Sequence, residues 1–262
     1  MKKYLLRGVT ASMMIPLLFL CVQASAQYRQ KLHTGINLTT GLSSKASIEG
    51  DGKTDYGLAS APQLLFEGTL NLYRELDEGY WLVTGLGGGV AAYNFDYYLP
   101  GDAFNPPAIY LFNNGAASRA RDLIYLKVPL ELERRWTTSR GNMWNANIGA
   151  SLLFAPPMDV TSIGTVVHDG RIYEYMRVEQ NNNNHGRPWF NYQLAGGYAW
   201  KLRWGHLLRV NLKLSLSFTD YGSATYRLSI PDKPVATGKY GVSGSYLGLT
   251  VGYLLKRAAP VE

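Results

Sequence analysis

Short segments in which apolar and polar side chains alternate recur along the whole chain, and they constrain its fold more than any other feature. Alternation with a period of two is the pattern of a β-strand that has one apolar face and one polar face. Eight such segments are present, at roughly 32–41, 64–73, 80–93, 124–133, 144–154, 190–201, 208–218 and 247–255. The sequence therefore predicts an all-β protein with eight antiparallel strands.

The connections between these segments alternate in length. Quick turns are expected near 75–79, 137–141 and 203–206, whereas the other connections run for roughly 20 to 35 residues and have loop composition. They contain Pro106-Pro107, Pro156-Pro157 and the asparagine run 181–184. Short periplasmic turns and long extracellular loops are typical of outer-membrane barrels. We therefore expect an up-and-down transmembrane β-barrel with both ends of the chain in the periplasm.

Alternation alone does not say which face points outward, because a soluble lipocalin-like barrel has its apolar face inside. The polar face of these segments is mostly Gly, Ser, Thr, Asn and Ala, and it carries few of the Lys and Glu residues of a water-facing exterior. This composition favours an apolar exterior and contact with outer-membrane lipid.

Tryptophan placement gives a second argument for a membrane. Five tryptophans fall at the short-turn ends of their segments, where an aromatic girdle would lie at the level of the lipid headgroups. They are Trp81, Trp136, Trp144, Trp200 and Trp204. Near the opposite rim we expect Phe154, Trp189, Phe218 and Tyr246.

Residues 1–26 have the features of a secretory signal peptide. A positive segment with Lys2, Lys3 and Arg7 precedes the apolar run 9–22, and the small residues 24–26 then form a signal-peptidase site. We expect cleavage after residue 26, which leaves 27–262 as one outer-membrane barrel domain of a Gram-negative bacterium. Lipid attachment at Cys21 is disfavoured because Leu20, a bulky residue, precedes it.

Composition excludes several kinds of site. Cys21 is the only cysteine, so the mature chain has no disulfide, no thiolate metal site and no cysteine nucleophile. The formal charge of +7 falls by the three signal-peptide cations to +4. Because these charges form no basic stretch, nucleic-acid binding is not expected. No apolar run of about 18 residues follows the signal, so no transmembrane helix is expected.

One motif resembles a known family. The run 125–132, Tyr-Leu-Lys-Val-Pro-Leu-Glu-Leu, is similar to the Tyr-Leu-x-x-Pro-Leu signature of the Bacteroidetes-type outer-membrane β-barrel domain family, the PorT-like group. The Gly-rich third segment and the closing run 246–253 are similar to that group as well. The resemblance implies an eight-stranded outer-membrane barrel and no chemistry. Pro129 cannot donate to a ladder, so we expect a ladder defect there.

An apolar exterior would direct several charged side chains into the lumen. They are Glu67, Lys127, Glu131, Arg209 and Lys213. The interior of an eight-stranded barrel is just wide enough to be filled by side chains, and charges there are costly unless they are paired. We therefore expect a charge network that closes the pore. The alternative is a narrow, porin-like channel for small solutes.

A lipid-modifying enzyme would need a histidine near a serine or aspartate at the extracellular end of a strand. His33 and His206 are expected at the periplasmic end, whereas His168, Asp169 and His185 fall in the third long loop. Their spacing matches no standard metal site. We therefore expect no catalytic residue, no metal and no cofactor.

The second long loop is rich in aromatic residues, which are Tyr93, Phe95, Tyr97, Tyr98, Phe104, Tyr110 and Phe112. Aromatic loops suit recognition of a protein or glycan, but the favoured interpretation is that these rings pack onto the barrel rim or extend the third strand. The sequence thus predicts a monomeric, non-enzymatic barrel with a structural or interaction role, and the channel and the lipid-modifying enzyme remain as alternatives.

Overall fold

The computed structural model describes residues 32–51, 56–91, 95–99, 109–110, 117–118, 123–181 and 188–255. The predicted signal peptide, His185 and the side chains of the loop aromatics other than Phe95 and Tyr97 lie outside the described residues.

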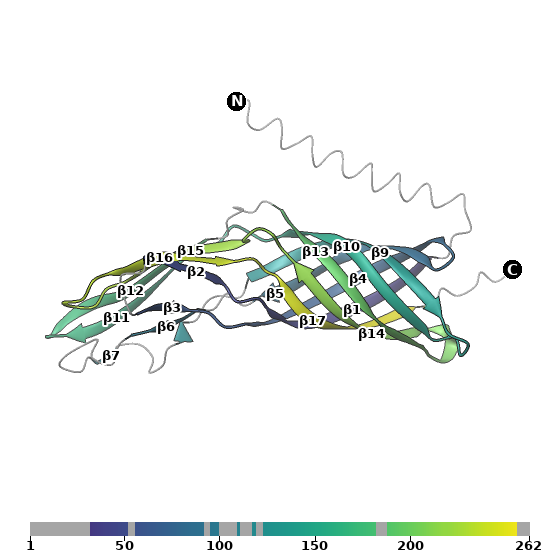
Figure 1. The fold of residues 1–262 in the computed structure, drawn as a ribbon, viewed down its shortest axis with the longest axis horizontal. Helices are drawn as coiled ribbons and strands as arrows, with labels where there is room; N and C mark the ends of the chain where they lie inside the picture. Colours follow the sequence, from purple (N-terminus) through teal and green to yellow (C-terminus); the bar gives the residue numbers. More distant parts are fainter. Residues whose placement is uncertain are drawn as a thin grey trace, which may run out of the picture.

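Eight antiparallel strands form a closed barrel, as predicted. They are β1 (Leu32–Ser43), β4 (Leu64–Asp77), β5 (Tyr80–Ala91), β9 (Leu123–Thr137), β10 (Met143–Phe154), β13 (Trp189–Lys201), β14 (Leu207–Leu216) and β17 (Tyr246–Leu255). Each strand pairs with its neighbours in the chain, and β1 pairs with β17 to close the cylinder (Figure 1).

The alternating pattern determines which side chains point outward. In β1, Ile36 and Leu38 are exposed, whereas Asn37 and Thr39, which alternate with them, are buried in the lumen. The other strands repeat this arrangement, so the outside is an apolar belt and the inside is polar. This orientation confirms the predicted apolar exterior and excludes the lipocalin arrangement.

Tight turns join the strands at one end of the barrel. Gly79 and Gly141 have φ angles of 76° and 77° there, in the left-handed region that favours glycine. The third turn contains the short 3₁₀ segment η1 (Arg203–Gly205). Within the described residues, no helix is long and apolar enough to cross a membrane.

Where the structure describes them, the long connections contain strands, and this corrects the sequence-based expectation of loops. They carry a six-stranded sheet and a three-stranded sheet that prolong the barrel along its axis (Figure 1), and we call these two sheets the extension. In sheet order the first contains β2 (Ser47–Gly50), β16 (Ala236–Val242), β15 (Gly222–Leu228), β12 (Arg171–Asn181), β11 (Asp159–His168) and β7 (Ile109–Tyr110). The second contains β3 (Gly57–Ala59), β6 (Phe95–Tyr98) and β8 (Ala117–Ser118).

A local signal for this extension was present in the sequence. Asp169 and Gly170, with φ angles of 50° and 72°, form the two-residue turn between β11 and β12. Asp-Gly between two alternating segments is a strong hairpin signal. The proline and asparagine runs favoured the loop prediction, and of these Pro156-Pro157 lies in the short connection between β10 and β11.

One apolar cluster joins the extension to the mouth of the barrel. Tyr175, Tyr226 and Tyr240 of the extension belong to the same buried cluster as Leu123 and Trp189 at the ends of β9 and β13. Two of the predicted loop aromatics belong there too. Phe95 is buried in an edge-to-face contact with the Tyr240 ring, and the Tyr97 hydroxyl lies 2.8 Å from the Tyr175 hydroxyl. For these two residues, packing is the observed role.

Pro129 interrupts a ladder without shifting its register. Between β5 and β9, pairing passes from Thr84 with Leu130 directly to Gly87 with Lys127. Between β9 and β10, Pro129 faces Ser151 in an unbroken register. The predicted ladder defect is thus confirmed on the β5 side, and no bulge accompanies it.

Candidate functional site in the lumen

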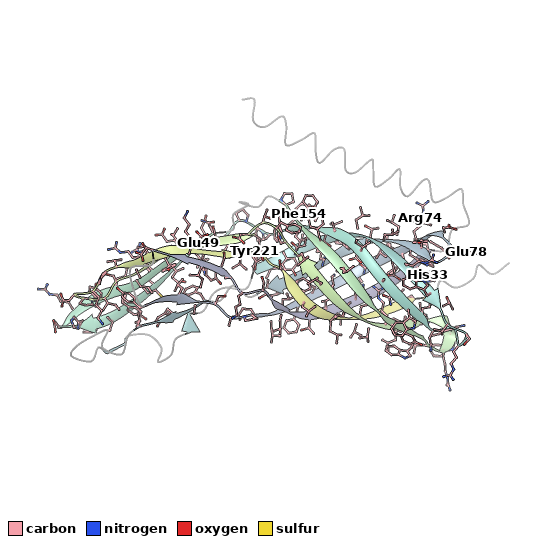
Figure 2. All side chains as sticks on the ribbon, viewed as in Figure 1. His33, Glu49, Arg74, Glu78, Phe154 and Tyr221 are labelled. Carbon is pink, nitrogen blue, oxygen red and sulfur yellow. The ribbon has the colours of Figure 1, made fainter. Side chains whose placement is uncertain are left out.

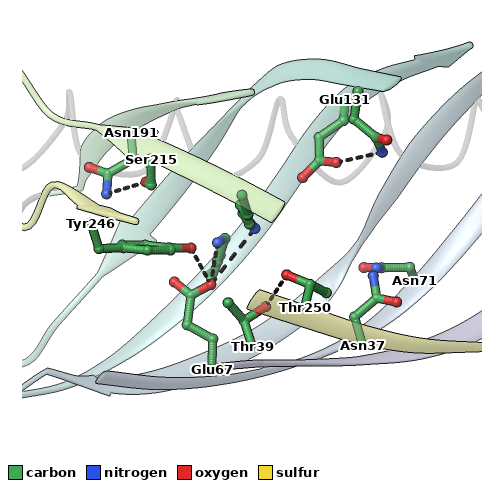
Figure 3. A network of polar contacts seen from close by, with 12 residues as sticks. Asn37, Thr39, Glu67, Asn71, Glu131, Asn191, Ser215, Tyr246 and Thr250 are labelled. Atoms are coloured by element: carbon green, nitrogen blue, oxygen red, sulfur yellow. Dashed lines mark hydrogen bonds and ion pairs between the residues drawn. The ribbon is translucent and has the colours of Figure 1, made fainter. Parts of the chain in front are cut away.

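A buried carboxylate organises the half of the lumen nearest to the extension. The Lys127 Nζ donates to Glu67 Oε2 at 2.8 Å, and the Tyr125 and Tyr246 hydroxyls each donate to a Glu67 oxygen at 2.7 Å. The Lys213 Nζ lies 3.8 Å from the same carboxylate. These five residues, which we call the Glu67 cluster, come from β4, β9, β14 and β17, and Figure 3 labels Glu67 and Tyr246 among them.

The glycines of β5 make room for this cluster. A Cβ atom on Gly89 would lie 2.5 Å from the Tyr125 hydroxyl and 2.8 Å from the Phe66 carbonyl oxygen. The inward face of β5 also carries Gly85 and Gly87, so the neighbouring side chains occupy the space above this strand. This accounts for the weak alternation of the third segment.

Replacing Gly89 by alanine is expected to lower the free energy of unfolding by about 1–3 kcal/mol, the usual cost of overpacking. The methyl group would displace the Tyr125 ring from its hydrogen bond with Glu67. Urea titration of the barrel in lipid vesicles measures this loss. Gly68→Ala on β4 is the control, because its Cβ would meet only the Leu38 side chain, at 3.6 Å. Equal losses in both variants would contradict this explanation.

A second carboxylate organises the half of the lumen nearest to the tight turns. Glu133 accepts hydrogen bonds from Arg209 Nη1 and Asn147 Nδ2, each at 2.9 Å, and forms an ion pair with Arg135 Nε. Arg209 Nη2 also lies 2.6 Å from the Tyr73 hydroxyl. We call these residues the Glu133 cluster.

Aromatic rings close the lumen on the tight-turn side of the Glu133 carboxylate. The Arg135 guanidinium lies 4.1 Å from the centre of the Trp81 ring and 5.2 Å from that of Tyr73. Cation–π contacts of this kind are favourable when the cation is desolvated. Leu207 and Leu254 pack against the same rings, so this end of the lumen is apolar and filled.

Between the two clusters the lumen holds a cavity of about 20 Å³. Four buried asparagines in its lining have side-chain oxygens without a hydrogen-bond partner: Asn37, Asn71, Asn147 and Asn211. A volume of this size corresponds to roughly one water molecule, which could donate hydrogen bonds to two of these oxygens. The cavity is far too small to form a wide pore.

The predicted lumen residues are only partly brought together. Glu67, Lys127, Arg209 and Lys213 are buried as expected, but they belong to two separate clusters. Glu131 is only half-buried, and its carboxylate accepts a hydrogen bond from Asn147 at 3.3 Å.

Sequence reasoning missed the glutamate of β9 that forms ion pairs with the two buried arginines. That residue is Glu133, which has only 1% of its surface exposed. It shares the inward face of β9 with Lys127, as does Arg135, and this shared parity was the available signal. Sequence reasoning also missed three tyrosines whose hydroxyl groups form hydrogen bonds inside the lumen, which are Tyr73, Tyr125 and Tyr246.

Four of the five tryptophans predicted for the girdle are exposed, and Trp81 is not. Trp136, Trp144, Trp200 and Trp204 are exposed at the tight-turn end. Trp81 is buried in the lumen, because the even-numbered residues of β5 point outward and Tyr80 takes the exposed place. At the other rim, Phe218 is exposed and Phe154 half-exposed, but Trp189 and Tyr246 are buried rather than lipid-facing.

Each described histidine contacts an aromatic ring or a carboxylate. His33, at the tight-turn end in Figure 2, packs edge-to-face on Trp81, and His206 stacks on Tyr253. His168 lies 3.6 Å from its neighbour Asp169. No group of three potential metal ligands is found among the described residues.

Comparisons with known proteins add little beyond the fold. No family model and no curated protein matches the sequence, so the resemblance to the PorT-like group stays a prediction. Among solved structures, the chain is similar to Neisserial surface protein A, with 10% identity, 86% of this chain and 97% of that chain covered, and a TM-score of 0.38. The chain is also similar to a major outer membrane protein from Thermus thermophilus, with 13% identity, 85% of this chain and 98% of that chain covered, and a TM-score of 0.39. The third is Ail, the attachment invasion locus protein of Yersinia pestis, with 9% identity, 87% of this chain and 100% of that chain covered, and a TM-score of 0.31. At these identities and TM-scores, the similarities carry no functional argument.

Proposed function

We propose that this chain is a non-conducting, non-enzymatic outer-membrane barrel that presents its extension outside the cell as an interaction surface. The observation that carries the proposal is a lumen filled by two ion-paired clusters beneath an ordered extension. The apolar belt supports the membrane location, because contact with lipid hydrocarbon is favourable for such a belt and contact with water is not. The resemblance to the PorT-like group favours an accessory role in secretion.

A pocket on the extension is a suitable place for a partner. It has a volume of about 350 Å³, and Glu174, Arg177 and Arg227 line it. Arg177 lies directly opposite Arg227 in the ladder between β12 and β15, an arrangement of like charges that is unfavourable without an anion nearby. Glu174 forms two hydrogen bonds with Arg177 at 2.7 and 3.0 Å, which hold the pKa of Glu174 below its usual value. Glu179 Oε1 also lies 3.9 Å from Arg177 Nη1, so two carboxylates balance the two guanidinium groups, and the pocket offers charges of both signs to a polar group on a protein or glycan.

Single-channel recording in a planar bilayer tests the closed lumen. The barrel is first refolded into lipid, and its heat-dependent gel shift confirms folding. We expect no discrete conductance steps, because both clusters block the lumen. Reproducible steps from the wild-type barrel would overturn the non-conducting role and favour the narrow channel.

Cysteine labelling on intact cells tests the orientation in the same protein. The mature chain contains no cysteine if cleavage occurs as predicted, so a single introduced thiol is the only target. Glu49 on the extension and Glu78 in a tight turn are exposed at opposite ends of the molecule (Figure 2). A membrane-impermeant maleimide should label Glu49→Cys on intact cells and Glu78→Cys only after permeabilisation. Labelling in the reverse order would place the extension in the periplasm.

A further inference from the structure

The outer wall of the barrel is hollowed where β4 meets β5. Gly68 and Gly88 lie directly opposite each other in this ladder. The same row of residues continues to Leu38 on β1 and to Leu126 on β9. Because neither glycine has a side chain, the apolar belt has a gap two strands wide at this point.

The gap is a groove of about 660 Å³. Its outward-facing walls are apolar except for one hydroxyl group, and they are formed by Leu38, Thr40, Phe66, Val90, Ile124, Leu126, Leu249 and Val251. Ligand pockets in proteins have volumes of roughly 300–1,000 Å³, so the groove is large enough for a specific ligand.

The groove offers little to a polar ligand. Glu67 and Tyr125 belong to its boundary, but their side chains point into the lumen, where each is hydrogen-bonded to the other. No charged side chain other than Glu67 belongs to the lining. Apart from the Thr40 hydroxyl, the outward-facing lining is apolar, so a ligand that fits must be apolar along most of the groove.

We propose that this groove binds one acyl chain of a membrane lipid, an inference that rests on the proposed outer-membrane location. The groove is continuous with the apolar belt, whose surroundings would be hydrocarbon. It lies in the half of the barrel nearest to the extension, since Gly68 is close to that end of β4 and the tryptophan girdle is at the other. The lipid would therefore come from the outer leaflet.

A second copy of the chain fits the groove less well. Two convex barrel walls touch along a narrow strip, whereas a specific protein interface buries roughly 1,000 Å² or more. A flexible acyl chain can follow the depression along the wall without that requirement.

The groove can be filled without disturbing the barrel. A Cβ on Gly68 would meet only the Leu38 side chain, at 3.6 Å, so Gly68→Leu should place its side chain in the groove. Gly88 is less suitable, because its Cβ would lie 2.9 Å from the Tyr125 carbonyl oxygen. Gly196 on β13 is the matched control. Its Cβ would also have its nearest neighbour at 3.6 Å, and Gly196 does not line the groove.

The test uses the full mature chain refolded into vesicles of dimyristoyl phosphatidylethanolamine and phosphatidylglycerol. After extraction into a mild detergent, native mass spectrometry counts the lipids that each barrel retains. We expect one retained lipid on the wild type and on Gly196→Leu, and about tenfold less lipid-bound protein for Gly68→Leu, the change that 1.4 kcal/mol of binding free energy would give.

Equal retention by all three proteins, or retention by none, would overturn the lipid site. A two-chain complex that only Gly68→Leu abolishes would identify a second copy as the occupant and would also overturn it. The heat-dependent gel shift separates these outcomes from a failure of the proposed function. A wild type that does not insert into the vesicles contradicts both, whereas insertion without a retained lipid contradicts the groove alone.

Discussion

Replacing Glu133 by glutamine is expected to lower the free energy of unfolding by about 3–5 kcal/mol, the cost of removing one partner from a buried ion pair. The substitution leaves Arg135 and Arg209 buried in the lumen without the carboxylate that neutralises them. The neutral glutamine amide has one acceptor oxygen and no negative charge, so it cannot balance the two guanidinium groups. Urea titration of the barrel in vesicles, followed by the gel shift, measures the change.

Glu131→Gln is the matched control for this prediction. Glu131 lies on the same face of the same strand, two positions away, but it is half-buried, and its carboxylate accepts a hydrogen bond from the neutral Asn147 amide. Its substitution should cost clearly less, about 1 kcal/mol, because glutamine can still accept the hydrogen bond from Asn147. A similar loss in both variants would mean that Glu133 is not the centre of its cluster.

The second large effect is expected at Glu67. Glu67→Gln removes the negative charge opposite Lys127, a lysine with only 1% of its surface exposed, and should also cost about 3–5 kcal/mol. Lys127→Met should cost less, because Glu67 keeps two tyrosine donors and the more distant Lys213. Figure 3 shows the Tyr246 hydroxyl pointing to the Glu67 carboxylate.

A double-mutant cycle isolates the interaction between these two residues. Once Lys127 is methionine, the further change Glu67→Gln leaves only Lys213, whose Nζ lies 3.8 Å from the carboxylate, without its negative partner. The double variant should therefore be more stable than the sum of the single losses predicts, with a coupling energy on the order of 1–3 kcal/mol. Additive losses would show that the two side chains do not depend on each other.

The sequence was sufficient for the barrel strands because their pattern is local. Each strand shows a period of two, and the burial of alternate residues such as Asn37 and Thr39 follows directly from it. Where the alternation is weak, the prediction fails. In β5, glycines occupy the inward positions, so the face of Trp81 could not be assigned and the residue was wrongly placed in the girdle.

The clusters in the lumen could not be predicted because they depend on contacts across the barrel. Arg209 on β14 reaches Glu133 on β9, although these strands are not neighbours and the residues are 76 positions apart. Which inward side chains meet depends on strand tilt and side-chain length. Glu131 and Glu133 have the same parity, and only the three-dimensional arrangement distinguishes them.

Bonds across the lumen also have a mechanical consequence. The Glu67 carboxylate connects β4 to β9 and β17, and Glu133 connects β9 to β14, so the two clusters act as transverse braces. Backbone ladders resist separation of adjacent strands, but they do little to resist flattening of the cylinder into an ellipse. The braces hold opposite walls at a set distance. The cross-section of this barrel should therefore stay round when lateral pressure in the bilayer changes.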